Sequence, residues 1–403
     1  MSARGKKAKV ILLGAAAAAV MLLIGLSLYG EHFSFSGERK AFLEAESGGK
    51  DAGSVFRNPQ SAGSNPTSLD APFPVVYRHL SRIINGNRQE IDILEINLAD
   101  RRVEVFPVLS FDRIFGFEKL SGMALRCGAY AAVNGGFFSI YGEPSGMVVI
   151  NGELITMPSG EYPVLVINEG RASLRQVEGG LKMEIGGASI GIDGMNRNGN
   201  PGETVLYTSA YGSTDRAESE HFTAAIENGV VVKTAWRKGE APIPDGGLLL
   251  AFFPPLGLDS AEIPFKKGDT AKLICGSHPG EHAHAYECGA WIVKDGAIVI
   301  ETEDKWIGVT TNRDPRTAVG LKDETALVLL TVDGRQPGYS SGLTGKELGN
   351  LLLELGVRDA AMLDGGASTE MIVEGKVVNR PSFKGRERPL GGAVAVRVKQ
   401  FSN

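Results

Sequence analysis

Two aspartates stand at the ends of apolar runs in the C-terminal third of the chain, and glycine follows each of them. Residues 326–332 are apolar and partly β-branched and end in Asp333-Gly334, and residues 360–363 end in Asp364-Gly365-Gly366. Short apolar runs that end in such turns are typical of buried strands. A carboxylate at a strand end can serve as nucleophile, as base or as partner of a developing positive charge.

Two arginines stand at or before the N-terminal ends of other apolar runs. Arg316 opens the run Arg-Thr-Ala-Val-Gly, and Arg388 precedes the apolar residues 393–396. A guanidinium group matches phosphate oxygens with two parallel hydrogen bonds. Taken singly, an arginine is usually a solvated charge and an Asp-Gly pair a tight turn. Their combination indicates a site that handles a phosphorylated ligand.

A helix between the two acidic runs should position the aspartates. Thr344 and Glu347 have the spacing of a capping box. Leucines at 348, 351, 352 and 355 form one apolar face, and Gly356 suits the C-cap, so we expect a helix over 345–355. A strand, a helix and a second strand make a crossover with parallel strands. Asp333 and Asp364 would then share the carboxyl edge of the sheet, where open α/β sheets bind ligands.

The rest of the folded region reads as short strands. We expect a hairpin of residues 91–98 with 103–106, a short helix at 120–127 and a strand at 129–133. Turn signals at Asn151-Gly152, 168–170, Asn228-Gly229 and 294–296 predict further hairpins. The expected fold class is α+β: one strand-rich domain over residues 71–403, with a mixed sheet that contains a β-α-β crossover.

The N-terminus predicts a membrane anchor. Four basic residues precede the uncharged, mostly apolar residues 10–29, which are long enough for a transmembrane helix. We therefore expect a cytoplasmic basic stub and signal anchor over residues 1–30, with the remainder extracytoplasmic, periplasmic or on the cell surface. A cleaved signal peptide is the alternative. Residues 31–70 are polar and rich in glycine and serine, as in a flexible linker.

Composition narrows the possible partners. The chain has 403 residues, of which 43% are hydrophobic and 22% charged, and its formal net charge is −5. No basic stripe occurs beyond the N-terminus, so a nucleic-acid partner is excluded. Cys275, His278, His282, His284 and Cys288 lie within fourteen positions. A Cys275–Cys288 disulfide is favoured over a metal site, and Cys127 would be a buried thiol.

Six short motifs together resemble the phosphodiester glycosidase family. The motifs are Asn-Gly-Gly-Phe-Phe at 134–138, Arg-Thr-Ala-Val-Gly at 316–320, Val-Asp-Gly-Arg at 332–335, Gly-Leu-Thr-x2-Glu-Leu at 342–348, Leu-Asp-Gly-Gly-Ala-Ser-Thr at 363–369 and Glu-Arg-Pro at 387–389. They occur in the family's order. One departure is Ala367-Ser368 where many members have Gly-Ser, which bears on the sugar preference.

The resemblance implies hydrolysis of a sugar-1-phosphodiester, with α-N-acetylglucosamine as one possible sugar, in cell-envelope or exopolysaccharide metabolism. It implies Asp364 as the first candidate for the catalytic carboxylate and Asp333 as the second, with no cofactor. The expected substrate-binding residues are Asn134, Gly135, Gly136, Arg316, Thr317, Arg335, Gly365, Gly366, Ser368, Thr369 and Arg388. Two alternatives stay open: an envelope-anchored module that binds phosphorylated glycan without cutting it, and a metal-dependent phosphodiesterase that uses both aspartates and the histidines.

Overall fold

The computed structural model describes residues 72–255, 263, 265–276 and 278–399. They belong to a compact unit that spans Ala71–Asn403. The expected basic stub, signal anchor and linker, residues 1–70, lie outside the described residues. Among the described helices, none has the length and apolar character needed to cross a bilayer.

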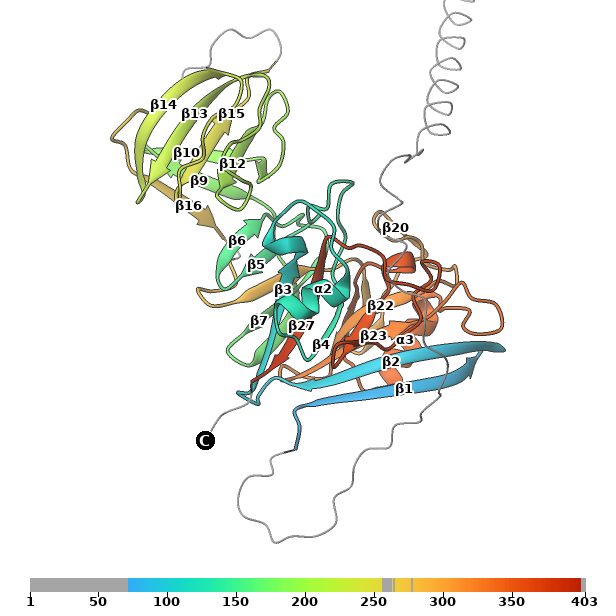
Figure 1. The fold of residues 1–403 in the computed structure, drawn as a ribbon. Coiled ribbons are helices and arrows are strands. Elements are labelled where there is room, and N and C mark those ends of the chain that lie inside the picture. Colours follow the sequence, from blue (N-terminus) through green and yellow to red (C-terminus); the bar gives the residue numbers. More distant parts are fainter. Residues whose placement is uncertain (1–71, 256–262, 264, 277, 400–403) are drawn as a thin grey trace, which may run out of the picture. The chain divides into compact units, whose positions relative to one another are not determined.

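The described fold is mostly β, and the expectation of an α+β fold is wrong (Figure 1). Two α-helices occur in the described residues, α2 (Leu120–Arg126) and α3 (Gly345–Glu354). Two single-turn 3₁₀ helices are η1 (Ser110–Asp112) and η2 (Gly366–Ser368). The strands of the described residues form six sheets. The fold is mostly β because the α3 segment alone combines a helical apolar face with a helix cap, while most other apolar runs pair as strands.

The largest sheet carries both aspartates of interest. Its order is β1 (Val75–Ile84), β2 (Asn87–Asn97), β23 (Ala326–Val332), β22 (Arg316–Leu321), β24 (Asp359–Met362), β18 (Trp291–Lys294) and β19 (Ala297–Ile298). Every neighbouring pair in it is antiparallel, so the expected mixed sheet is also wrong. Strands β23 and β24 do run in the same direction, but β22 lies between them.

Helix α3 makes the connection from β23 to β24 and covers one face of this sheet. Leu348, Leu351 and Leu352 are buried in one hydrophobic cluster with residues of β2, β18, β22, β23 and β24. The predicted capping box is confirmed, because the Thr344 hydroxyl accepts a hydrogen bond from the Glu347 amide and the Glu347 carboxylate accepts one from the Thr344 amide. The helix thereby begins at the residue that its sequence indicates.

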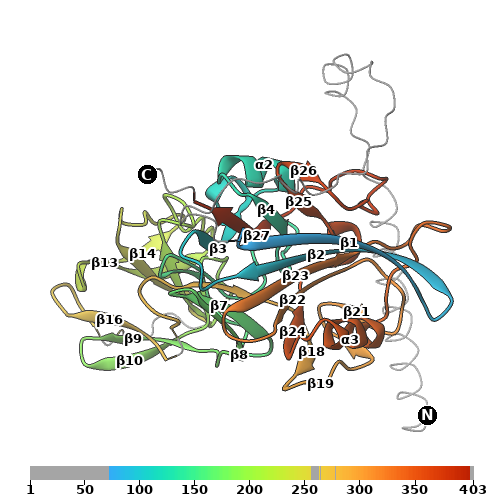
Figure 2. The same cartoon turned by 90° about the horizontal axis from the view of Figure 1, so that it is seen from below.

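A five-stranded sheet packs against the other face of the largest sheet. Its order is β26 (Lys376–Val377), β25 (Met371–Val373), β4 (Ala131–Asn134), β27 (Gly392–Val398) and β3 (Val103–Leu109). Side chains from both sheets share one hydrophobic core, and α2 packs on the far side of the five-stranded sheet. Figure 2 shows α2 and α3 on opposite outer faces of these layers.

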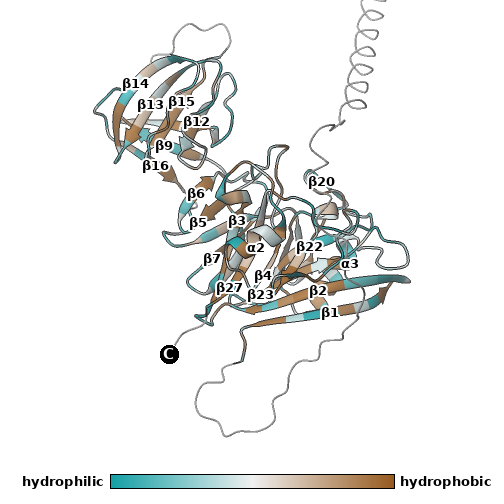
Figure 3. Ribbon diagram, viewed as in Figure 1, coloured by the Kyte–Doolittle hydropathy of each residue, from teal (hydrophilic) through white to brown (hydrophobic). Residues whose placement is uncertain are grey.

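Four further sheets are built from residues 148–309. One five-stranded sheet has the order β6 (Glu153–Thr156), β5 (Val148–Ile150), β17 (His284–Glu287), β7 (Pro163–Asn168) and β8 (Arg171–Gln176). Another has the order β11 (Gly194–Met195), β12 (Thr204–Thr208), β15 (Leu248–Phe252), β13 (Glu220–Glu227) and β14 (Val230–Lys238). The smaller ones are β10 (Ala188–Ile192), β9 (Leu181–Ile185) and β16 (Ala271–Cys275), and the hairpin β20 (Glu303–Asp304) with β21 (Gly308–Val309). Apolar residues follow the strands, and polar residues are frequent in the connections (Figure 3).

The predicted hairpins that have a two-residue turn are present in the structure, and the one predicted with a longer connection is not. The turns at 151–152, 169–170, 228–229 and 295–296 all have two residues with positive φ and join paired strands, so these four hairpins are confirmed. The hairpin of residues 91–98 with 103–106 is wrong. Strand β2 pairs with β1 through a turn at Asn85-Gly86, and β3 pairs with β27.

Candidate active site

The ends of four strands bring charged side chains to one pocket of about 270 Å³. Arg316 begins β22, Arg335 lies just after β23, Asp364 just after β24, and Arg388 just before β27. The pocket is lined by Phe137, Trp306, Ile307, Asp314, Arg316, Arg335, Met362, Leu363, Asp364, Gly365, Gly366, Ala367 and Arg388. The structure therefore brings together one of the two candidate aspartates and all three candidate arginines.

Arg316 is a buried guanidinium, with 3% of its surface exposed. Its Nε donates to the Leu343 carbonyl at 3.0 Å and its Nη2 to the Asn312 carbonyl at 2.9 Å. Within the described residues no carboxylate forms an ion pair with it, and burial lowers its pKa. A buried charge without a counter-ion is costly, so this site is electrostatically prepared for an anion.

The other two arginines are more exposed and partly held in place. The Arg335 Nε donates to Asp314 Oδ1 at 2.7 Å, and its guanidinium lies against Gly366, where an added Cβ would be 3.2 Å from it. The Arg388 Nη1 donates to the Ser368 hydroxyl at 2.9 Å, and its guanidinium lies 5.5 Å from the centre of the Phe138 ring. Three guanidinium groups and two carboxylates leave the pocket with an excess of positive charge.

Asp364 is the carboxylate of the pocket without a direct ion pair. Burial raises its pKa, while a hydrogen bond from Ser368 and the positive charge of Arg388 oppose that rise. Because Ser368 contacts both Asp364 and Arg388, its hydroxyl links the acid to a phosphate-binding candidate. A carboxylate with a raised pKa is a better proton acceptor at neutral pH than an exposed one.

The Asn-Gly-Gly segment, residues 134–136, hydrogen-bonds the backbone of Asp364 and does not line the pocket. Asn134 is buried and its Nδ2 donates to the Asp364 carbonyl at 2.6 Å, while its Oδ1 accepts from the Thr317 hydroxyl at 2.7 Å. The Gly135 carbonyl accepts the Asp364 amide at 3.1 Å. A Cβ on Gly135 or Gly136 would collide with the Tyr286 ring or hydroxyl at less than 3 Å. These residues position the Asp364 backbone.

Asp333 does not line this pocket. It is 1% exposed, and its carboxylate accepts hydrogen bonds from Asn379 Nδ2 at 2.9 Å, the Arg380 amide at 2.8 Å and the Tyr339 hydroxyl at 3.1 Å. Burial raises its pKa to about 6. The structure thus places Asp333 where it ties the end of β23 to residues 339 and 379–380.

The remaining predicted residues fall into two groups. Gly365 and Gly366 line the pocket, and the Gly366 amide donates to the Pro315 carbonyl at 2.9 Å, which sets the turn after Asp364 beside Arg316. Gly366 has φ of +60°, so a larger residue there would be strained as well as close to Arg335. Thr369 is buried and contributes its carbonyl to Asn379.

Two sets of residues near the pocket were not anticipated. Glu370 is completely buried, and its Oε1 accepts the backbone amide of Arg388. Phe137, Trp306 and Ile307 supply an apolar part of the lining. The motif at 134–138 contained Phe137, but nothing in the sequence indicates that the hairpin β20–β21 reaches this site.

The cysteine and histidine segment does not form the expected disulfide. Cys288 is a buried thiol that donates to the Tyr286 carbonyl, so no disulfide joins it to Cys275. His278 hydrogen-bonds the Gly152 carbonyl, whereas His284 accepts the Asn151 amide. No group of three or more potential metal ligands occurs in the described part of the chain. Cys127, expected to be buried, is half-buried at the end of α2.

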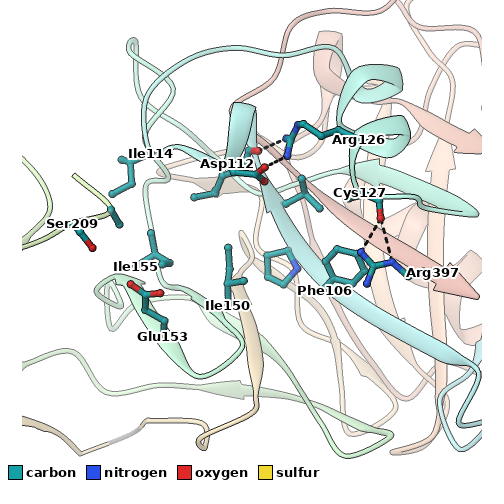
Figure 4. Close-up of a pocket in the computed structure, with 14 residues that line it drawn as sticks. Phe106, Asp112, Ile114, Arg126, Cys127, Ile150, Glu153, Ile155, Ser209 and Arg397 are labelled. Carbon is teal, nitrogen blue, oxygen red and sulfur yellow. Dashed lines mark hydrogen bonds and ion pairs between the residues drawn. The ribbon is translucent and has the colours of Figure 1, made fainter. Parts of the chain in front are cut away.

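A larger pocket of about 570 Å³ lies elsewhere, between β3 and the β5–β6 hairpin, and its arginines are already paired (Figure 4). Arg126 pairs with Asp112 and Glu118. Arg397 pairs with Glu104 and donates to the Cys127 carbonyl. Because carboxylates neutralise both guanidinium groups, this pocket lacks the unpaired buried charge that distinguishes the smaller one.

The fold and the site together define a class of protein: a mostly β domain with an arginine-lined pocket around one aspartate. Residues 186–397, just over half of the chain, match the family model described as phosphodiester glycosidase. The chain therefore belongs to the phosphodiester glycosidase family, and the resemblance drawn from its motifs is confirmed. The family assignment supports hydrolysis of phosphodiester glycosides in general.

Solved structures share the fold. A hypothetical protein from Synechocystis superposes with a TM-score of 0.69 at 19% identity, covering 81% of this chain and 62% of that one. A protein of Burkholderia pseudomallei described as exported gives a TM-score of 0.63 at 22% identity, covering 77% of this chain and 74% of that one. The prophage-derived protein YomE of Bacillus subtilis is 36% identical over 99 residues, which are 25% of this chain and 15% of YomE. This chain thus aligns with a small part of that relative.

Proposed function

We propose that this protein hydrolyses glycosyl-1-phosphodiesters, releasing a free sugar and a phosphomonoester. The observation that supports this most directly is the buried Arg316 guanidinium, which has no carboxylate partner in the described structure and lines the same pocket as Asp364. A phosphodiester supplies the missing negative charge, and its sugar supplies a carbon on which Asp364 can act.

The proposed reaction breaks the bond between the anomeric carbon and the phosphate oxygen. Arg316, Arg335 and Arg388 bind the phosphate oxygens and stabilise the charge that the departing phosphomonoester gains. Since phosphate is a weak base, its departure requires charge stabilisation more than a proton. Asp364 faces the positive anomeric carbon and accepts the proton of the water that adds there. Ser368 keeps the Asp364 carboxylate oriented, and Asn134 holds its backbone.

We place this activity outside the cytoplasm, in cell-envelope or exopolysaccharide metabolism. The support is the fold shared with the Burkholderia pseudomallei protein described as exported. Within such metabolism, polymers joined through sugar-phosphate bonds are the chemically suitable substrates. The sugar can be α-N-acetylglucosamine, as the family resemblance implies.

Replacement of Asp364 tests the proposal. The full chain is incubated with a panel of glycosyl-1-phosphodiesters, nucleotide sugars included, and free sugar is measured. Asp364→Asn should lower turnover by about a thousandfold or more, because the amide cannot accept a proton or stabilise positive charge. Asp359→Asn is the matched control, since Asp359 begins the same strand, β24, and lies away from the pocket.

Two results would contradict the proposal. Undiminished release of sugar by Asp364→Asn would remove Asp364 from the reaction. A wild-type chain that binds the phosphodiesters and releases no sugar from any of them would identify a glycan-binding module without hydrolytic activity.

A further inference from the structure

The pocket has an apolar wall in addition to its charges. Phe137, three residues after β4, and Trp306 and Ile307, in the β20–β21 hairpin, line the same 270 Å³ as the three arginines and Asp364. Neither the phosphate nor the attacking water in the proposed reaction uses an apolar surface. The wall therefore requires a different part of the substrate.

Trp306 is fixed in orientation before any ligand arrives. Asp304 Oδ1 accepts the amides of Trp306 at 2.8 Å and of Ile307 at 2.9 Å, which locks the hairpin tip. The indole stacks on the Tyr162 ring with centroids 4.1 Å apart and planes 29° apart. Lys305, the residue before Trp306, pairs with Glu161, the residue before Tyr162. A ring held in this way loses little conformational entropy when it binds a ligand.

The packing of the wall requires a glycine at position 289, where a side chain would occupy the space of Phe137 and Ile307. A Cβ on Gly289 would lie 2.7 Å from the Phe137 ring and 3.3 Å from the Ile307 side chain. The Phe137 ring in turn lies 5.4 Å from Trp306, tilted by 49°. Two segments far apart in sequence thus meet over a backbone position that leaves them room. The wall is a packed surface and does not consist of one chance aromatic residue.

We propose that this wall, with Trp306 at its centre, is the subsite for the apolar face of one pyranose ring, the sugar whose anomeric carbon lies beside Asp364 in the proposed reaction. The inference rests on the proposed function and adds the ring's binding surface to it. A pyranose presents C–H groups on one face, and an aromatic ring gains dispersion contacts from them.

Size and connectivity favour a single sugar over other ring systems. A volume of about 270 Å³ lies just below the usual range for small-molecule pockets, about 300–1,000 Å³, which suits one ring and its phosphate. In the proposed reaction the carbon beside Asp364 is the anomeric carbon, so the ring nearest to the wall is the sugar. The second substituent of the phosphodiester lies on the opposite side of the phosphate that the arginines bind. A nucleobase of a nucleotide sugar would occupy that farther side.

Binding measurements separate the wall from the anion site. Calorimetry on the full chain compares inorganic phosphate, N-acetylglucosamine-1-phosphate and uridine monophosphate. Trp306→Ala should weaken N-acetylglucosamine-1-phosphate about tenfold, a typical loss for one aromatic contact, and leave phosphate unchanged. Trp306→Phe should recover most of the loss, because it restores a ring. Trp236→Ala, which removes an exposed tryptophan of β14, is the control.

The outcomes distinguish this inference from the function on which it rests. Equal losses for phosphate and sugar phosphate in Trp306→Ala would make Trp306 a structural residue and overturn the inference. A loss confined to uridine monophosphate would assign the wall to a nucleobase and overturn it too. If the wild type binds phosphate and N-acetylglucosamine-1-phosphate with equal affinity, the inference alone fails. Absence of phosphate binding would contradict the proposed function, and the inference with it.

Discussion

Glu370 is a carboxylic acid in an environment that disfavours its charge. Its side chain is completely buried, Oε1 accepts the Arg388 amide, and Oε2 has no hydrogen-bond partner in the described structure. Burial raises its pKa to about 8, the Arg388 amide and charge oppose the rise, and Glu387 adds to it. The acid thus holds the Arg388 backbone in place while it carries a proton at neutral pH.

Glu370→Gln should stabilise the protein and flatten its pH dependence. Between the unfolded pKa, near 4.5, and the folded pKa, about 8, the native state binds more protons, so the free energy of unfolding falls as pH rises. Glutamine keeps an acceptor for Arg388 and cannot ionise, so it should gain up to about 3 kcal/mol at pH 7. Urea unfolding at pH 5 and pH 8 measures this. Glu218→Gln, at an exposed position, should behave as wild type. If the free energy of unfolding of Glu370→Gln fell with pH as steeply as that of the wild type, Glu370 would not be the source of the pH dependence.

Single residues were predictable where the chemistry coincided with a strand end. Asp364, Arg316 and Arg388 were identified for that reason, and the structure brings them to one pocket. Asp333 has the same sequence setting, yet Asn379 and Arg380 cover it. The sequence around it does not reveal a cover formed by a segment 46 residues away.

At the scale of elements, α3 is the part whose start is best defined by local sequence. Its capping box satisfies two amides that the first helical turn leaves without partners. Glu347 also pairs with Arg313 and accepts a hydrogen bond from Asn85, so its replacement would disturb three contacts. Thr344 contributes to the cap alone and is the cleaner position to change.

Thr344→Ala should lower the free energy of unfolding by about 1 kcal/mol, the usual cost of losing an N-cap hydroxyl. The loss should appear in chemical denaturation as a lower midpoint with an unchanged slope. Thr311→Ala removes a hydroxyl from an exposed loop position nearby and serves as control. If both variants lose the same few tenths of a kcal/mol, the cap does not stabilise the helix.

Elements were predictable to the extent that their signals are local. The four confirmed hairpins each have a two-residue turn whose positive φ values favour glycine and asparagine or aspartate. The pairing of β2 with β23, and of β3 with β27, joins segments more than 200 residues apart in sequence. Alternation of apolar residues indicates a strand and says nothing of its partner, so the fold class was wrong although many strands were correct.

At the scale of the whole molecule, the pocket lies where two layers of the fold meet. Arg316, Arg335 and Asp364 come from strand ends in the seven-stranded sheet, and Arg388 leads into β27 of the five-stranded sheet. These strands belong to the shared core. An anion bound by the three arginines would link both sheets, so its binding energy should appear in global unfolding.

Inorganic phosphate should therefore stabilise the whole described domain, and Arg316 should be required for it. At a phosphate concentration one hundred times Kd, the free energy of unfolding should rise by about 2.7 kcal/mol. Arg316→Met keeps the buried volume but removes the charge, so its unfolding should respond little to phosphate. Arg397→Met removes a guanidinium that is paired with Glu104 and lines the other pocket, and it should keep the full response. Denaturant unfolding with and without phosphate, at constant ionic strength, measures all three proteins. Equal responses of Arg316→Met and Arg397→Met would place the anion elsewhere, because only one of these residues lines the pocket of Asp364.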